Sequence, residues 1–307
     1  MKIMNKQILC IGEVLWDRLP SGAKPGGAPM NVALHLNAIG QNVSISSRIG
    51  NDEPGNELKS FLEKSGLSTE FIQVDSSLPT SEVLVHLDEN NNATYEICEP
   101  VAWDNLELTE LLMEKAAQSG LIIYGTLASR KPESRSTILS LLENGAVKLI
   151  DVNLRKPYDS REIVELLLSK ADIVKLNDDE LITIAKWHNQ FSFNEKEMAT
   201  WFAGQYNAEL VCVTKGEKGA ILYSKGEFLE HPGFKVDAVD TVGAGDAFLA
   251  GFVAALFEEK SKDKALEFAC ATGAFVATKA GATPEYNMNE IEQILISNKN
   301  KYVEKIY

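Results

Sequence analysis

The feature that most constrains the fold of this chain is a regular alternation of short apolar runs with segments of helical periodicity. The apolar runs recur along most of the 307 residues: Ile8–Ile11, Val43–Ile49, Leu121–Gly125, Val147–Val152, Asp172–Leu176 and Leu210–Thr214. Between them, apolar residues recur every three or four positions, as in Leu106–Ala117, Arg161–Leu168 and Glu180–Trp187. The alternation predicts βαβ units and an α/β fold with a mainly parallel sheet covered by helices on both faces. Ligands of such a sheet bind beyond the carboxyl ends of the strands.

Two stretches depart from this rhythm and predict a separate small sheet. Residues 81–87 and 93–98 are strand-like, and the polar segment 88–92 between them is typical of a hairpin rather than a βαβ unit. Residues 13–25 are too short and too rich in turn formers for a helix. Because a hairpin alone is marginally stable in water, we expect these pieces to rest on the core, a ligand or a second subunit.

The composition disfavours several classes of protein. With 30 basic and 44 acidic residues the net charge is −14, which disfavours nonspecific binding to nucleic acid or an anionic membrane. No apolar stretch approaches the ~18 residues of a membrane span, and the polar start is unlike a signal peptide. The cysteines are spaced too irregularly to predict disulfides or a zinc site: Cys10, Cys98, Cys212 and Cys270. Together these features predict a cytoplasmic protein.

The strongest local signal is Asp240–Asp246, which reads DTVGAGD and precedes the almost wholly apolar segment 247–256. Two glycines before a helix let backbone N–H groups face an anion, and the helix macrodipole favours negative charge there. Asp246 would stand beside that anion, where a carboxylate makes sense as the base for a hydroxyl that attacks a phosphate. The structural alternative is a helix that needs glycine at its entry and carries an acid in its first turn.

Five further segments fall at predicted strand ends or helix starts, where an α/β sheet binds its ligands. They are Pro25–Asn31, Asp151–Arg155, Asn177–Glu180, Thr214–Gly216 and Lys279–Ala282. Each alone could be a turn, a helix cap or a solvated loop, but their common placement favours a functional interpretation. The sequence has neither the Walker pattern GxxxxGKS/T nor a complete GxGxxG after a strand, so a nucleotide site here would be of another kind.

At these residues the sequence resembles the ribokinase-like (PfkB-type) carbohydrate kinases, and within them the fructokinases, over essentially the whole chain from Gly12 to Pro284. Two motifs carry the resemblance, namely the glycine pair with its downstream asparagine, Gly26–Asn31, and the run Asp240–Asp246. Two further segments agree with the family pattern: Asp151–Arg155 and the NxxE run Asn177–Glu180.

The resemblance implies one domain over residues 1–307, a three-layer αβα sandwich with a mainly parallel central sheet. The two out-of-rhythm stretches, about 13–25 and 78–103, would form a small β-sheet lid through which the protein would pair as a homodimer. The implied activity is transfer of the γ-phosphoryl group of ATP to a sugar hydroxyl. The implied cofactors are ATP, Mg²⁺ and K⁺, and the partners are the sugar and ATP, without nucleic acid or membrane.

The family's catalytic and sugar-binding residues carry over onto matching positions. Asp246 would be the base, and the N–H groups of Gly243, Ala244 and Gly245 would form an anion hole for the transferred phosphoryl group. Arg155 would lie near the phosphates and the sugar. The residues that would hold the sugar are Asp17, Gly26, Gly27, Asn31 and Asn153.

Nucleotide and metal sites carry over in the same way. The nucleotide would lie against Thr214, Gly216, Gly243, Gly245, Cys270 and Gly273. Mg²⁺ would be organised through its waters by Asn177 and Glu180. A monovalent cation would be held by carbonyl groups near Asp240, Val242, Lys279 and Gly281. Glu285 departs from the pattern, because some members have a small hydroxyl residue there.

The charge of the predicted lid bears on the choice of sugar. Residues 78–103 contain no Lys or Arg and five acidic residues, although Arg18 and Lys24 lie nearby. A substrate with its own carboxylate or phosphate would be repelled there unless a basic residue paired with it, and the similar 2-keto-3-deoxygluconate kinases place an Arg in this region. We therefore expect a neutral sugar, fructose first, phosphorylated on a primary hydroxyl. The alternatives are a kinase of ribose, 2-keto-3-deoxygluconate or a nucleoside, and a non-catalytic sugar sensor on the same fold.

Overall fold

The computed structural model describes residues 6–19, 22–87, 93–191 and 194–303. In chain order the elements are β1 (Gln7–Ile11), β2 (Leu15–Leu19), β3 (Gly22–Gly26), α1 (Ala28–Ala38), β4 (Asn42–Gly50), α2 (Glu53–Lys64), β5 (Ile72–Asp75), β6 (Ser81–Leu87), β7 (Ala93–Ile97), η1 (Ala102–Asn105), α3 (Glu110–Gln118), β8 (Leu121–Gly125), η2 (Leu127–Ser129), α4 (Pro132–Leu141), β9 (Val147–Asp151), α5 (Arg161–Leu168), β10 (Ile173–Asn177), α6 (Asp178–Trp187), α7 (Glu195–Tyr206), β11 (Leu210–Thr214), η3 (Gly216–Lys218), β12 (Ala220–Ser224), β13 (Glu227–His231), α8 (Ala244–Phe257), α9 (Lys262–Ala277) and α10 (Met288–Val303).

The main sheet has nine strands in the order β13-β12-β11-β10-β9-β8-β1-β4-β5. Every neighbouring pair from β11 to β5 is parallel, whereas β12 and β13 extend one edge as an antiparallel hairpin. The parallel strands all end at one edge of the sheet, so the segments that follow β1, β8, β9, β10 and β11 lie near one another. The predicted mainly parallel sheet is confirmed.

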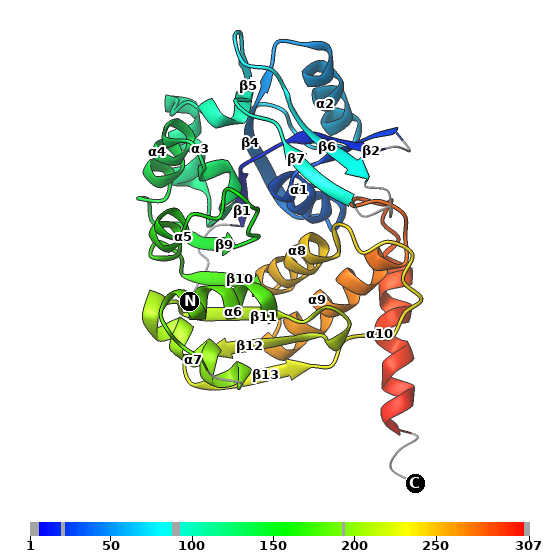
Figure 1. Cartoon of the computed structure of the whole chain (residues 1–307). Helices are drawn as coiled ribbons and strands as arrows, with labels where there is room; N and C mark the ends of the chain where they lie inside the picture. Colours follow the sequence, from blue (N-terminus) through cyan, green and yellow to red (C-terminus); the bar gives the residue numbers. More distant parts are fainter. Residues whose placement is uncertain (1–5, 20–21, 88–92, 192–193, 304–307) are drawn as a thin grey trace.

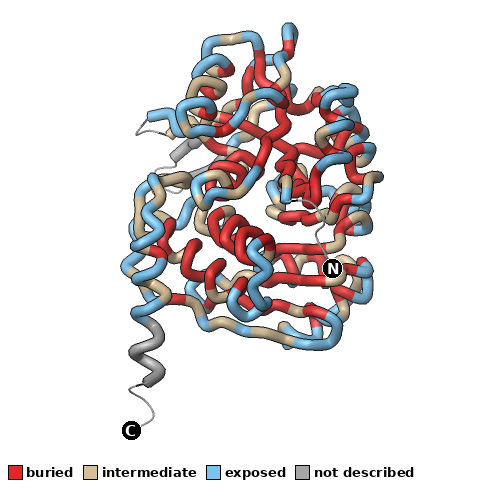
Figure 2. Tube along the Cα trace, turned by 180° about the vertical axis from the view of Figure 1, so that it is seen from behind, coloured by how far each residue is buried: buried red, intermediate tan, exposed pale blue. Residues whose placement is uncertain are grey.

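Helices cover both faces of this sheet and make it the middle of three layers (Figure 1). Along β1, Ile8 and Cys10 belong to one hydrophobic core, and Leu9 and Ile11 belong to the other, as the two-residue period of a strand requires. The first core is covered by α1, α2, α8 and α9, and the second by α3 to α7. Figure 2 shows the buried strands running through the middle, with exposed residues on the outer sides of the helices.

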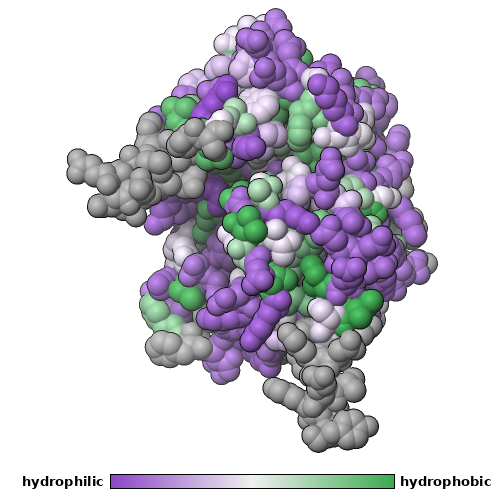
Figure 3. Space-filling view, turned by 90° about the vertical axis from the view of Figure 1, so that its right-hand side faces the viewer, coloured by the Kyte–Doolittle hydropathy of each residue, from purple (hydrophilic) through white to green (hydrophobic). Residues whose placement is uncertain are grey.

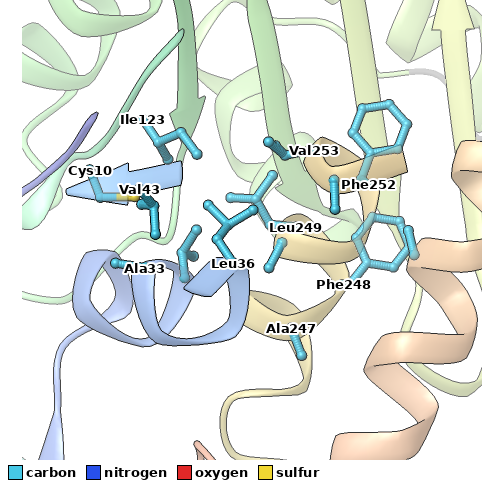
Figure 4. Close-up of a cluster of buried hydrophobic side chains, with 14 of the residues drawn as sticks. Cys10, Ala33, Leu36, Val43, Ile123, Ala247, Phe248, Leu249, Phe252 and Val253 are labelled. Carbon is cyan, nitrogen blue, oxygen red and sulfur yellow. The ribbon is translucent and has the colours of Figure 1, made fainter. Parts of the chain in front are cut away.

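The packing of α1 against α8 brings together segments far apart in the sequence. Side chains of both helices, among them Leu36 and Leu249, meet Cys10 and Ile123 of the sheet in one core (Figure 4). Helix α8 has apolar residues on all sides because it lies between α1 and α9, with Phe252 and Val253 almost fully buried. This core fixes the N-terminal ends of α1 and α8 relative to each other.

A second sheet, with strand order β3-β2-β6-β7, lies beside α1 and α2 (Figure 1). The predicted β6–β7 pair is antiparallel, while the turn predicted over 88–92 falls outside the described residues. The Trp16 indole N–H donates to Pro54 O over 2.9 Å, which attaches the small sheet to α2. Arg18 and Glu82 form an ion pair between adjacent strands β2 and β6.

The helix predicted over residues 106–117 differs most in its bounds, whereas the one predicted over 180–187 begins two residues earlier, at Asp178. Residues 106–117 show helical periodicity, but α3 begins only at Glu110, because Thr109 caps it by accepting the Leu112 N–H over 3.2 Å. Upstream, η1 and the buried Leu106 pack into the second core instead. Among the described residues no helix is both long and apolar enough to cross a membrane. The face seen in Figure 3 is mostly hydrophilic, with small separate apolar patches.

Candidate active site

The N-terminus of α8 is built on a glycine that no other residue could replace without rearrangement. Gly243 precedes the helix with a φ of 78°, and a Cβ there would lie 2.5 Å from the Ala282 carbonyl oxygen. The close approach brings the segment after α9 against the start of α8. Ala244, Gly245 and Asp246 follow in the first turn, where the helix macrodipole favours an anion. Of the predicted anion-hole donors, the Ala244 N–H donates to Thr241 O over 3.2 Å.

Asp246 is tied to the glycine-pair motif by a direct hydrogen bond. The Asn31 Nδ2 group donates to Asp246 Oδ2 over 2.8 Å. Burial, and secondly the charge of Asp151, raise the pKa of Asp246 to about 6, against the opposing effects of Lys175, Asn31 and Arg155. The carboxylate is therefore largely ionised at neutral pH and still basic enough to accept a proton. Asn31 Oδ1 is buried and has no partner within the described residues, so it remains available to a ligand.

A buried ion pair that the sequence interpretation missed lies beside this helix start. Lys175 on β10 and Asp151 on β9 are cross-strand neighbours, and Lys175 Nζ lies 2.9 and 3.0 Å from the two carboxylate oxygens. A Cβ on Gly245 would stand 3.4 Å from the same Nζ, so the ammonium group adjoins the first turn of α8. Burial alone would lower the pKa of Lys175, but Asp151 and Asp246 raise it above its usual value. The sequence carried one signal for this ion pair, because Lys175 is a charged residue inside an apolar run predicted to be a buried strand.

The glycine pair permits close approach of the β1–β2 segment to the start of α1. A Cβ on Gly27, which has a φ of 114°, would lie 2.4 Å from Glu13 O, and a Cβ on Gly26 would lie 2.5 Å from Asp17 Oδ2. Burial raises the pKa of Asp17, and the charge of Arg155 opposes this, which places the guanidinium within electrostatic range. The predicted sugar residues Asp17, Gly26, Gly27 and Asn31 therefore come together.

Glu13, also missed from the sequence, is a buried carboxyl group in this region. The residue is only 3% exposed, and its Oε2 atom has no partner among the described residues. Burial, with the charge of Asp246, raises the pKa of Glu13 to about 7, while Arg155 lowers it. A small cavity of about 10 Å³, room for roughly one water molecule, is lined by Glu13, Thr126, Asp151 and Asn153 among others.

The loop after β9 brings two predicted residues to the same edge. Asn153 has a φ of 40°, an uncommon conformation for a non-glycine residue that is often found at functional sites. Arg155 is exposed, and its charge acts on Glu13, Asp17 and Asp246 alike. The guanidinium therefore lies at the mouth of the site rather than in its floor.

The predicted magnesium residues form a reciprocal helix cap at the start of α6. Asn177 Oδ1 accepts the Glu180 N–H over 2.8 Å, and Glu180 Oε2 accepts the Asn177 N–H over 2.8 Å. Glu180 Oε1 also accepts the Leu154 N–H, so the carboxylate ties the Arg155 loop to α6. Within the described residues no three His, Cys, Asp or Glu side chains gather closely enough to hold a metal directly. This donor set fits contacts to a hydrated ion better than direct ligation.

The remaining predicted positions lie around α8 and α9. A Cβ on Gly273 would be 3.0 Å from Ala244 O, so α9 packs closely against the start of α8; Cys270 is buried one turn earlier. Thr214 ends β11, and Gly216 follows with open space beside it.

Asp240 joins the predicted cation segments directly. Its side chain accepts N–H groups from Val242 and Gly281 over 3.0 and 3.1 Å. The side chain of Lys279, by contrast, turns to Glu290 at 2.6 Å, so only its backbone can face this site.

Comparison with known proteins gives a consistent result. The pattern of the pfkB family of carbohydrate kinases matches residues 22–288. A probable fructokinase-3 of Arabidopsis thaliana is 31% identical, over 90% of this chain and 87% of that protein. A fructokinase of Klebsiella pneumoniae is 30% identical, over 91% of this chain and 95% of its own.

Solved structures agree on the fold. A fructokinase of Xylella fastidiosa with bound ATP superposes with a TM-score of 0.83 at 24% identity, over 96% of this chain and all of that one. An uncharacterised sugar kinase of Pyrococcus horikoshii gives 0.80 at 26% identity, over 94% and 99% of the two chains. The expected ribokinase-like architecture is confirmed, and the chain belongs to the pfkB family of carbohydrate kinases.

Proposed function

We propose that this protein transfers the γ-phosphoryl group of ATP to O6 of fructose, giving fructose 6-phosphate. The observation that carries the proposal is the Asn31–Asp246 hydrogen bond at the glycine-lined start of α8. It sets a carboxylate of suitable basicity between the segment that would hold the sugar and the helix end that would hold the phosphoryl group. Relatives named fructokinase, at about 30% identity over nearly the whole chain, support the choice of fructose.

Asp246 acts as the general base in this proposal. A carboxylate with a pKa of about 6 takes the proton of the sugar hydroxyl as its oxygen attacks the phosphorus. The N–H groups of Gly243 and Gly245 and the Lys175 ammonium then stabilise the negative charge on the transferring group. Because Asp151 holds Lys175 in place beforehand, little reorganisation is needed during the reaction.

The sugar is held by Asp17, Asn31, Asn153 and the Gly26–Gly27 backbone. Arg155 lies at the mouth of the site, near both the sugar and the phosphates. The β3-β2-β6-β7 sheet is the lid of a single domain, which closes over the sugar and excludes water. Arg18, a cation in this sheet, is already paired with Glu82, which leaves it poorly placed for a charged substrate. This pairing supports a neutral sugar. The same sheet is the proposed homodimer contact.

The nucleotide lies along Thr214, Gly216, Cys270 and Gly273. Mg²⁺, when bound, would neutralise phosphate charge, with Asn177 and Glu180 ordering its waters from the cap that they form. A potassium ion would suit the carbonyl groups of the two segments that Asp240 joins, and would fix the entry of α8. Removal of K⁺ should therefore raise the KM for ATP.

The test is an ADP-release assay with ATP, Mg²⁺ and K⁺ against fructose, ribose, 2-keto-3-deoxygluconate, adenosine and fructose 6-phosphate. A kcat/KM of roughly 10⁴ M⁻¹s⁻¹ or more on fructose supports the proposal. Asp246→Asn should lower kcat about 10²- to 10⁴-fold and leave ATP affinity unchanged. A higher efficiency on another substrate would reassign the substrate. If no substrate causes ADP release but a sugar still raises the melting temperature, a non-catalytic sensor would be favoured.

A further inference from the structure

Arg130, which follows η2, lies in a buried cluster that the proposed reaction does not use. Its guanidinium carbon stands 4.1 Å from the ring centre of Trp103 and 4.5 Å from that of Tyr158, so the group is sandwiched between two aromatic faces. Nε and Nη2 donate to the two carboxylate oxygens of Asp104 over 2.7 and 2.8 Å. Arg130 is only 7% exposed, and Nη1 has no partner among the described residues.

The cluster also binds the segment in which the chain leaves the small sheet, at the end of β7. Arg130 Nη2 also donates to the carbonyl of Cys98, the residue after β7, over 2.9 Å. The Tyr158 hydroxyl donates to the carbonyl of Ile97, the last residue of β7, over 3.2 Å. Two consecutive carbonyl groups at the end of the lid are therefore held by the same stacked pair of side chains.

The cluster also holds the loop that carries Arg155. The Tyr158 N–H donates to Arg155 O over 2.7 Å, which closes a turn between the two residues. The Tyr158 ring, in turn, is fixed by its stack on Arg130. Arg130 thus contacts, directly or through one ring, both the exit strand of the small sheet and the loop that bears a predicted substrate residue.

We propose that Arg130 is a positioning residue that couples the lid sheet to the Arg155 loop, so that both adopt their sugar-binding arrangement together. The proposal rests on the proposed function in treating that sheet as the lid. The geometry requires arginine, because only a planar guanidinium can stack on two rings while bonding Asp104 with two parallel N–H groups. A lysine keeps the charge but loses the planar stacking and the fork.

The test compares Arg130→Lys with Arg48→Lys. Arg48 is the control, since it is 8% exposed and pairs with Asp75 and Glu107. Its hydrogen bond goes to Asn105 O at the end of η1, the residue after Asp104, rather than to β7 or the Arg155 loop. Hydrogen–deuterium exchange of the free protein is measured over residues 93–101 and 153–158, together with the melting temperature, the KM values and sugar-independent ATP hydrolysis.

Both variants should lose thermal stability. Only Arg130→Lys should exchange faster in both segments, and its kcat/KM for the sugar should fall about 100-fold, as expected for a misplaced substrate group. Its ratio of ATP hydrolysis to sugar phosphorylation should rise. If Arg130→Lys loses stability but exchange in these segments is unchanged, Arg130 only forms a structural ion pair. That result would overturn the proposal.

A milder variant keeps the proposal testable if Arg130→Lys does not fold. Tyr158→Phe retains the ring and removes only the hydroxyl that bonds Ile97 O. It should increase exchange over 93–101 and raise the sugar KM, in the same direction and to a smaller extent; no change in either overturns the coupling. Hydrogen–deuterium exchange is measured without substrate, so it tests the role of Arg130 independently of activity. A wild-type protein that is inactive on every sugar would refute the proposed function but not the proposed role of Arg130.

Discussion

Asn31 Nδ2 lies 2.8 Å from Asp246 Oδ2, a hydrogen bond between residues 215 positions apart in the sequence. The bond joins the first turns of α1 and α8, whose apolar sides share one core (Figure 4). It therefore fixes the carboxylate relative to the glycine pair as well as to its own helix. Because the bond also favours the charged form of Asp246, it connects the geometry of the site to its pH dependence.

Replacing Asn31 should shift the pH profile of the reaction. Asn31→Leu removes a donor to the carboxylate, so the pKa of Asp246 should rise from about 6 by about one unit. The base must be ionised, and the acidic limb of kcat at saturating sugar should move to higher pH by the same amount. Asn37→Leu, on the same helix but bonded to Ser65 O, is the control and should leave the limb in place. An unmoved limb in Asn31→Leu would show that Asp246 is not the titrating base.

Lys175→Met tests whether the buried ammonium group serves catalysis or only balances Asp151. The single variant leaves an unpaired buried carboxylate and should cost about 3–5 kcal/mol of stability, with kcat reduced on the order of 10²- to 10³-fold. The double variant Asp151→Asn/Lys175→Met removes both charges and should recover most of the stability without recovering kcat. Recovery of kcat in the double variant would leave Lys175 a purely structural role. Chemical denaturation and steady-state kinetics measure both effects.

Much of the fold and the centre of the site could be predicted from the sequence. Apolar runs located the parallel strands except β5, and the glycine motifs located Asn31 and Asp246, because these signals are local. The Lys175–Asp151 pair could not be predicted, since it depends on the register between β9 and β10. The Arg130 cluster draws its members from four separate segments, so no window of sequence contains it.

Gly243→Ala should impair catalysis more than folding. A side chain at a φ of 78° costs about 1–2 kcal/mol, and the added Cβ would meet the Ala282 backbone, so the entry to α8 must shift. Because the first N–H groups of α8 would then be misaligned, kcat should fall on the order of 10²-fold. Gly226→Ala is the matched control, with a φ of 87° and no atom within 4 Å of the new Cβ. It should show the stability cost alone, whereas equal kcat values for the two variants would contradict an anion hole at this turn.

Glu13→Gln should change the pH dependence of stability. The carboxyl titrates near 4.5 in the unfolded chain and near 7 in the folded one, so between these values the folded state binds more protons and loses stability as the pH rises. The loss is complete above about pH 7 and amounts to about 3 kcal/mol for the full shift. A glutamine has no charge to bury. The stability of Glu13→Gln relative to wild type should therefore increase by about that amount between pH 4.5 and pH 8.

Urea unfolding at several pH values measures this difference. Repeating it in the Asp246→Asn background removes the charge that helps to raise the pKa of Glu13, so the pH-dependent gain should persist there but become smaller. A flat difference for Glu13→Gln across the same range would mean that the Glu13 carboxyl is solvated in solution. In that case the unpaired Oε2 atom would already be hydrogen-bonded to water, and the small cavity that Glu13 lines would be open to solvent.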